Sequence, residues 1–241
     1  MKTKFLISLF LLVGRYSQAQ VGMNCQYVPG IQFGTVKVKT NNAALGSEYK
    51  FKAGLPILMI DRVTNHWYTN LDFSSLYYAA TATNKAADNQ IKIAKSEGAY
   101  AAGRLGYLFG KGDQFRIGAN INLGFSTSNL DSLKKPMDNR GYTNFGGGLI
   151  VYKKIGKKMR FVGKVGYEKI AAKSFITKAH GFYVETTLGY SIMQKYGLSI
   201  MPCYYSKSFD YTPKTANATA NVLTNAKVSS FVIRVGLTKF F

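Results

Sequence analysis

Ten stretches of the sequence alternate between apolar residues and polar or small ones with a period of two. The clearest is Phe115–Ser126, in which six apolar residues alternate with six polar or small ones. This alternation indicates a β-strand with two unlike faces, because a helix repeats roughly every 3.6 residues. The ten predicted strands are Ile31–Lys39, Tyr49–Ile60, Trp67–Thr81, Ala99–Phe109, Phe115–Ser126, Tyr142–Tyr152, Met159–Lys169, Phe182–Ile192, Tyr196–Ser206 and Ser229–Phe240.

The connections between these stretches are alternately short and long. The short ones are Asp61–His66, Gly110–Gln114, Lys153–Lys158 and Met193–Lys195. The longer ones are Asn84–Gly98, Asn129–Gly141, Ala172–Gly181 and Lys207–Lys227. Membrane barrels combine an even strand number with short periplasmic turns and longer outer loops. The sequence therefore predicts an all-β fold, a transmembrane antiparallel β-barrel of about ten strands (with a range of eight to twelve), in the outer membrane with both termini in the periplasm.

Aromatic residues on the apolar face gather at both ends of the predicted strands. Next to the short connections lie Trp67, Phe109, Phe115, Tyr196 and Phe241. At the opposite ends lie Tyr49, Tyr77, Phe125, Phe182, Tyr204 and Phe231. Aromatic rings prefer the boundary between hydrocarbon and headgroups, so two such belts favour a barrel whose apolar face meets lipid.

The first nineteen residues predict a secretory signal peptide. Lys2 and Lys4 precede the ten-residue apolar run Phe5–Gly14, and Ser17–Ala19 offers the small residues at which signal peptidase cleaves. The run is too short to span a bilayer as a helix, which takes about 20 apolar residues. We expect residues 1–19 to be removed and residues 20–241 to form a single barrel domain.

Basic residues outnumber acidic ones, and the formal net charge is +21. An exported chain rarely meets nucleic acid, so lipid phosphates are the expected anionic partners rather than DNA or RNA. Many of the cations fall in or near the predicted outer loops and predict a basic rim facing outer-membrane lipid and glycolipid. These are Lys85, Lys92, Lys95, Lys134, Lys135, Arg140, Lys173, Lys178, Lys207, Lys214 and Lys227.

A second set of charged residues has the parity of the barrel interior. It comprises Arg104, Arg116, Arg160, Lys164, Glu168, Glu185 and Arg234. Charges inside a narrow barrel must be paired or hydrated. One interpretation is a salt-bridge network in which the two glutamates pair with the cations. The other is an anion-selective constriction, since basic rings favour anions.

Few residues suit catalysis or metal binding. The chain has two histidines, His66 in a predicted periplasmic turn and His180 in an outer loop without a carboxylate to orient it. Cys25 and Cys203 permit at most one disulfide, and since Cys203 lies well inside a strand, pairing requires Cys25 to fold into the lumen. The sequence thus predicts no enzyme, no catalytic residue, no metal site and no cofactor.

The final strand carries a terminal motif with alternating apolar residues: Phe231, Ile233, Val235, Leu237 and Phe241. This motif resembles the C-terminal signature of bacterial outer-membrane barrels, and the whole mature chain resembles the small outer-membrane β-barrel proteins common in Bacteroidetes. The resemblance implies a Gram-negative envelope and recognition of these five residues by the barrel-assembly machinery. It implies no catalytic residues.

These observations predict a structural or surface-interaction role with basic outer loops. Two alternatives stay open: a narrow, porin-like passive pore that prefers anions, and a barrel subunit of a larger secretion or uptake complex with other envelope proteins as partners.

Overall fold

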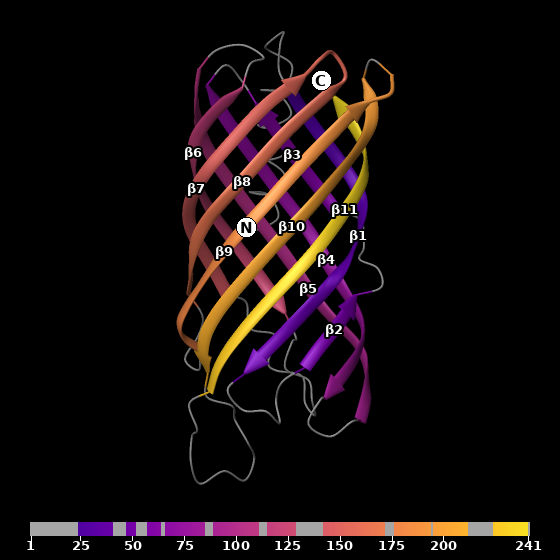
Figure 1. Cartoon of the computed structure of the whole chain (residues 1–241), viewed down its shortest axis with the longest axis vertical. Coiled ribbons are helices and arrows are strands. Elements are labelled where there is room, and N and C mark those ends of the chain that lie inside the picture. The colour runs from indigo at the N-terminus through magenta and orange to yellow at the C-terminus, as the bar shows by residue number, and fades with distance from the viewer. Residues whose placement is uncertain are drawn as a thin grey trace, which may run out of the picture.

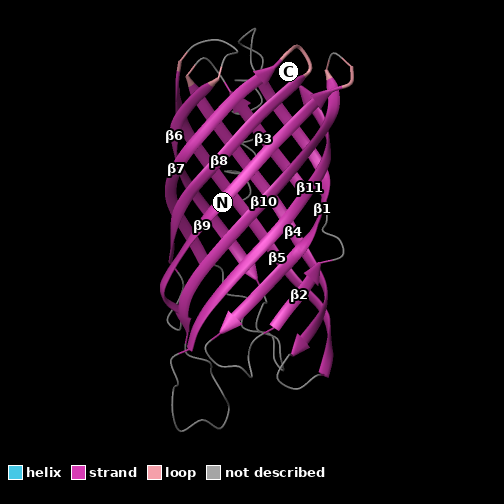
Figure 2. Cartoon of the chain, viewed as in Figure 1, coloured by secondary structure: helices cyan, strands magenta, loops and turns pink. Residues whose placement is uncertain are grey.

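The computed structural model describes residues 24–40, 47–51, 57–63, 66–84, 89–110, 115–128, 142–171, 176–193, 195–211 and 224–240. Within these ranges the regular elements are all strands (Figure 2). They are β1 Asn24–Thr40, β2 Ser47–Phe51, β3 Ile57–Val63, β4 Trp67–Asn84, β5 Asn89–Phe109, β6 Arg116–Ser128, β7 Tyr142–Ile155, β8 Met159–Ala171, β9 Ile176–Ser191, β10 Tyr196–Tyr211 and β11 Thr224–Phe240. Among the described residues, no helix has the length and apolar character needed to cross a membrane.

The strands form one closed antiparallel sheet. From β3 to β11 each strand pairs with the next along the chain, and β11 pairs with β1 from Gln26↔Phe240 to Thr40↔Ala226. The strands are strongly tilted around the barrel, and the short turns lie at the end that also carries the C-terminus (Figure 1). Closure leaves no strand edge facing lipid, which a bilayer requires. The predicted all-β antiparallel barrel is confirmed.

The second predicted strand is divided into β2 and β3, which occupy one place in the sheet. Both pair with β1 on one side and β4 on the other, so the barrel has ten positions around its wall, as predicted. Sequence parity also predicts a bulge near Gly34. The register between β1 and β11 is unbroken there. The irregularity instead lies in the second predicted strand. Gly30 pairs with Ile57 and Gly34 pairs with Phe51, so four steps along β1 correspond to six steps from Phe51 to Ile57.

Several strands extend further at the outer end than predicted. The predicted loop Asn84–Gly98 is largely a hairpin, in which pairing continues to Asn84↔Asn89. Parts of the loops Ala172–Gly181 and Lys207–Lys227 likewise belong to β9, β10 and β11. These loop predictions were wrong because pairing satisfies backbone hydrogen bonds beyond the bilayer as well as within it.

The two faces of the wall differ as the alternation predicts. On β6, Ile121 and Leu123 are 66% and 62% exposed, whereas Arg116 and Asn122 are 3% and 5% exposed. The sheet is thus apolar outside and polar inside, the arrangement expected in lipid. Most described belt residues are exposed on the outer wall: Trp67, Phe109, Phe115, Tyr196, Phe125, Phe182 and Phe231.

Candidate functional site: the barrel lumen

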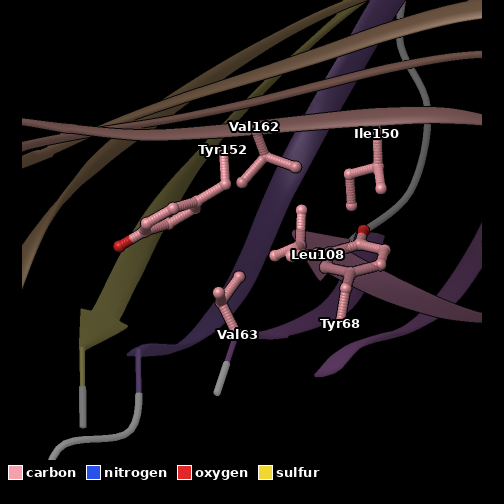
Figure 3. Close-up of a cluster of buried hydrophobic side chains, with 6 residues drawn as sticks. All are labelled: Val63, Tyr68, Leu108, Ile150, Tyr152 and Val162. Atoms are coloured by element: carbon pink, nitrogen blue, oxygen red, sulfur yellow. The ribbon is translucent and has the colours of Figure 1, made fainter. Parts of the chain in front are cut away.

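An apolar layer crosses the lumen near the periplasmic end. Six buried side chains from opposing parts of the wall point toward one another in Figure 3. They are Val63 on β3, Tyr68 on β4, Leu108 on β5, Ile150 and Tyr152 on β7, and Val162 on β8. All six have the interior parity, where the sequence analysis expected mainly polar residues. Apolar side chains disfavour water at this level of the lumen.

Arginines lie beside this layer. Arg116 is buried, and its guanidinium carbon lies 4.5 Å from the centroid of the Tyr152 ring, a cation–π contact. Arg160 is half-buried at the start of β8.

Glu185 on β9 is the centre of the charged layer. It forms an ion pair with Arg104 of β5, and its Oε2 lies 2.9 Å from Nζ of Lys164. The Tyr205 hydroxyl also donates a hydrogen bond to its Oε1 at 3.0 Å. Since β6, β7 and β8 lie between β5 and β9, the Arg104–Glu185 pair reaches across the lumen.

The network continues from Arg104 toward β3 and β4. Arg104 Nη1 donates to Asn70 Oδ1 at 2.6 Å, and Asn70 Nδ2 donates to Asp61 Oδ1 at 2.8 Å. The Tyr68 hydroxyl donates to the same Asp61 oxygen at 2.5 Å. Tyr68 therefore joins the apolar layer through its ring and the charged layer through its hydroxyl.

A second ion pair joins β4 to β11. Arg234 Nη1 lies 2.6 Å from Asp72 Oδ2, and both side chains are buried. Nearby interior positions hold the small apolar cluster Met59, Met201 and Cys203. Cys203 is a buried free thiol, so the disulfide with Cys25 that the sequence permits is not formed.

Glu168 on β8 is the centre of a polar group on the outer side of the network. Its Oε2 accepts a hydrogen bond from Asn144 at 2.5 Å and a longer one from Asn122 at 3.4 Å. Its Oε1 lies 3.5 Å from Lys207 Nζ. Lys207 crosses β9 at Gly181, where an added Cβ would lie 3.1 Å from its Cγ. Lys207 was predicted to belong to the outer rim, but it is directed into the lumen.

Several network residues were missed in the sequence. Asp61 was assigned to a periplasmic turn, yet β3 continues to Val63 and Asp61 is buried in the lumen. Trp67 faces the lipid, so residues an odd number of positions after it on β4 face the lumen. Asn70 and Asp72 are such residues, and the alternation that starts at Trp67 therefore identifies both. Among the residues whose burial is described, the lumen thus holds four carboxylates, Asp61, Asp72, Glu168 and Glu185, where the sequence analysis counted two.

The glycine at position 124 is expected to be necessary for the Glu168 group. An added Cβ there would lie 2.6 Å from Asn144 Oδ1, too close for any real contact. Gly124→Ala should displace the Asn144 amide from Glu168 and cost about 1–3 kcal/mol. Urea unfolding in lipid vesicles measures this. Gly103→Ala is the matched control, since its Cβ meets only Leu71 at 3.7 Å. Equal stability of the two variants would contradict the argument.

The histidines lie outside the lumen. His66 stacks on Tyr107 with centroids 5.5 Å apart, and His180 stacks on Tyr167 at 5.8 Å. Among the described residues, no three His, Cys, Asp or Glu side chains are grouped as metal ligands. In the predicted assembly motif, Phe231 and Leu237 are exposed on the outer wall, whereas Ile233 and Val235 are half-buried. Phe241 lies outside the described residues.

No family model and no curated protein matches this sequence. Solved structures match its fold. The outer membrane protease OmpT from Escherichia coli aligns with a TM-score of 0.51 and 10% identity, covering 92% of this chain and 99% of that chain. The outer membrane protein OprG from Pseudomonas aeruginosa aligns at 0.43 and 11% identity, covering 92% and 97%. The Pseudomonas putida toluene transporter TodX aligns at 0.34 and 10% identity, covering 90% of each chain.

The comparison shows the fold. This chain has the β-barrel fold of an outer-membrane protein. It also corrects one prediction, that the chain is not an enzyme. That prediction rested on the lack of a histidine with an orienting carboxylate, but a barrel of the same fold is a protease. The architecture therefore does not restrict the chain to non-enzymatic roles.

Proposed function

We propose that this barrel has a closed lumen and acts through its outer surface, in a structural or surface-interaction role. The observation that carries the proposal is the Arg104–Glu185 ion pair, which joins opposing parts of the wall. The apolar layer of Val63, Tyr68, Leu108, Ile150, Tyr152 and Val162 supports it, because side chains fill the interior of a narrow barrel.

The proposed partners lie outside the wall. Phosphorylated outer-leaflet lipid and glycolipid are the anions that basic residues at the outer end would attract. Lys227 is exposed there, whereas Lys178 pairs with Asp210 and Lys207 pairs with Glu168. Other envelope proteins are a further class of partner, and a role as a subunit of a secretion or uptake complex would be revealed by proteins that co-purify in mild detergent.

We further propose the biogenesis that the sequence implies. Residues 1–19 would direct export and be removed, and the barrel-assembly machinery would recognise the terminal strand with its alternating Phe231, Ile233, Val235 and Leu237. The resemblance to small barrels common in Bacteroidetes supports an origin in a Gram-negative envelope of that type.

The closed-lumen proposal predicts electrical silence. Purified protein reconstituted in planar bilayers with simple salt should give no steady single-channel current, because both the charged and the apolar layers would have to open for ions to pass. Incorporation of folded protein must be verified in parallel by heat-modifiable migration on a gel.

The opposite outcome is equally clear. Reproducible anion-selective steps that disappear in Arg116→Ala would show that the basic lumen conducts, and would favour the narrow pore instead. Arg116 is a suitable residue for this test because it lies buried in the lumen beside Tyr152, next to the apolar layer.

A further inference from the structure

Four residues from neighbouring strands form one row on the outer wall of the barrel near its outer end. Lys169 of β8 pairs with His180 of β9, His180 pairs with Ser208 of β10, and Ser208 pairs with Lys227 of β11. Lys169, His180 and Lys227 are exposed and Ser208 is half-buried. We call these four residues the outer-wall row. In the β1–β11 register the next position beyond Lys227 is also a lysine, Lys39.

The tilt of the strands sets the depth of each end of this row. Because the strands tilt as Figure 1 shows, the row runs toward the outer end from β8 to β11. Three strand separations of about 4.8 Å at a tilt of about 40° place Lys227 about 9 Å further out than Lys169. Phe231 lies four residues from Lys227 on β11, toward the periplasmic end. Lys169 therefore lies at about the depth of the Phe231 ring.

That depth is the boundary of the hydrocarbon layer. Phe231 and Phe182 are exposed on the lipid-facing wall, and Phe182 contacts the Tyr204 ring with centroids 5.5 Å apart. Such rings mark the level where acyl chains meet headgroups. Lys169 thus lies at this boundary, and Lys227 lies further toward the cell exterior, in the headgroup layer.

The two lysines keep their charge available. No described carboxylate forms an ion pair with Lys169 or Lys227. Glu168, next to Lys169 in sequence, faces the lumen and pairs with Lys207, and Asp210 lies two residues beyond Ser208. A hydrogen bond from Asn225 and the Lys178 ammonium lower the pKa of Asp210, so it is ionised and neutralises Lys178 instead.

His180 is held in place beside Lys169. Its ring stacks on the exposed Tyr167 with an interplanar angle of 23°, and its Nδ1 lies 3.0 Å from the Lys178 carbonyl oxygen. A carbonyl oxygen only accepts, so Nδ1 donates and the ring orientation is fixed. Tyr167 and His180 form a flat polar-edged surface on the strands that carry Lys169 and its partner position, against which a headgroup can lie.

We propose that the outer-wall row binds the phosphate groups of an outer-leaflet glycolipid, with its acyl chains against the apolar wall below. This deepens the surface role proposed above and moves the contact from the loops to the strands. Charge complementarity identifies the occupant, because cations at the headgroup level of a lipid-facing wall meet phosphates before any soluble anion. Each cation near such a surface contributes about 1 kcal/mol to the attraction.

The test uses the folded full-length barrel in phosphatidylcholine nanodiscs containing diphosphorylated lipid A. Native mass spectrometry counts the lipid A molecules that remain bound. Wild-type protein should retain lipid A but not its dephosphorylated form. The double variant Lys169→Gln/Lys227→Gln should lose affinity about tenfold or more. The matched control is Lys153→Gln/Lys195→Gln, which removes two exposed lysines at the periplasmic end and should bind as wild type.

Three results would overturn the inference: equal retention by the double variant and wild type, equal loss in the periplasmic control, or equal retention of dephosphorylated lipid. Displacement of lipid A by inorganic phosphate would also overturn it, since the site would then serve a soluble anion. None of these results depends on conduction, so the closed-lumen proposal can fail or succeed separately.

Discussion

Glu185→Ala is expected to lower the free energy of unfolding by about 3–5 kcal/mol. The substitution removes the carboxylate that Arg104 and Lys164 share, and also the acceptor of the Tyr205 hydroxyl. Both cations stay buried, where an unpaired charge is very costly. The effect should therefore exceed that of an ordinary loss of one hydrogen bond.

The measurement is urea unfolding in lipid vesicles, followed by the fluorescence of Trp67, the single tryptophan of the chain. Heat-modifiable migration on a gel should also be lost at a lower temperature. Asp210→Asn is the matched control, because its partner Lys178 lies at the outer end with an 81% exposed side chain that water can solvate when the pair is broken. Exposed pairs contribute little. A Glu185 variant as stable as this control would indicate a hydrated lumen and strengthen the pore alternative.

The sequence predicts the wall of this barrel well. Alternation marks which residues face lipid, and a closed sheet is the one way in which strands can satisfy their backbone in a bilayer. Residues such as Ile121 and Asn122 therefore fall on the predicted faces. Strand ends are harder to predict, because pairing continues into water without a change of pattern. The extended β4–β5 hairpin, with Thr83↔Gln90 in register, is the clearest case.

The interior is predicted less completely, for two physical reasons. Parity assigns a residue to the lumen but not to a depth, so it could not show that Leu108 and Ile150 meet in one apolar layer. Ion pairs also join strands that are distant in sequence, and their partners depend on the closure and tilt of the whole barrel. Lys207 illustrates this, since its side chain reaches Glu168 over Gly181 on the strand between them, where an added Cβ would lie 3.1 Å from its Cγ.

The ion pair between Asp72 and Arg234 should show strong coupling. It joins β4 to β11 with both side chains buried, separated by 162 residues in sequence. Asp72→Asn leaves the arginine without its counter-charge, and Arg234→Met leaves the aspartate without its own. Each single variant is expected to cost about 3–5 kcal/mol, because each leaves one unpaired charge in the lumen.

The double variant Asp72→Asn/Arg234→Met should lose less free energy of unfolding than the two single variants lose together. It removes both charges together, and methionine restores apolar volume beside Met59, Met201 and Cys203. Only part of the single costs is recovered, because the asparagine amide stays buried in the lumen. The double-mutant cycle, measured by urea unfolding, is expected to give a coupling energy of about 2–3 kcal/mol. Additive effects would mean that water screens the two charges, and hence that the lumen at this level is open to solvent.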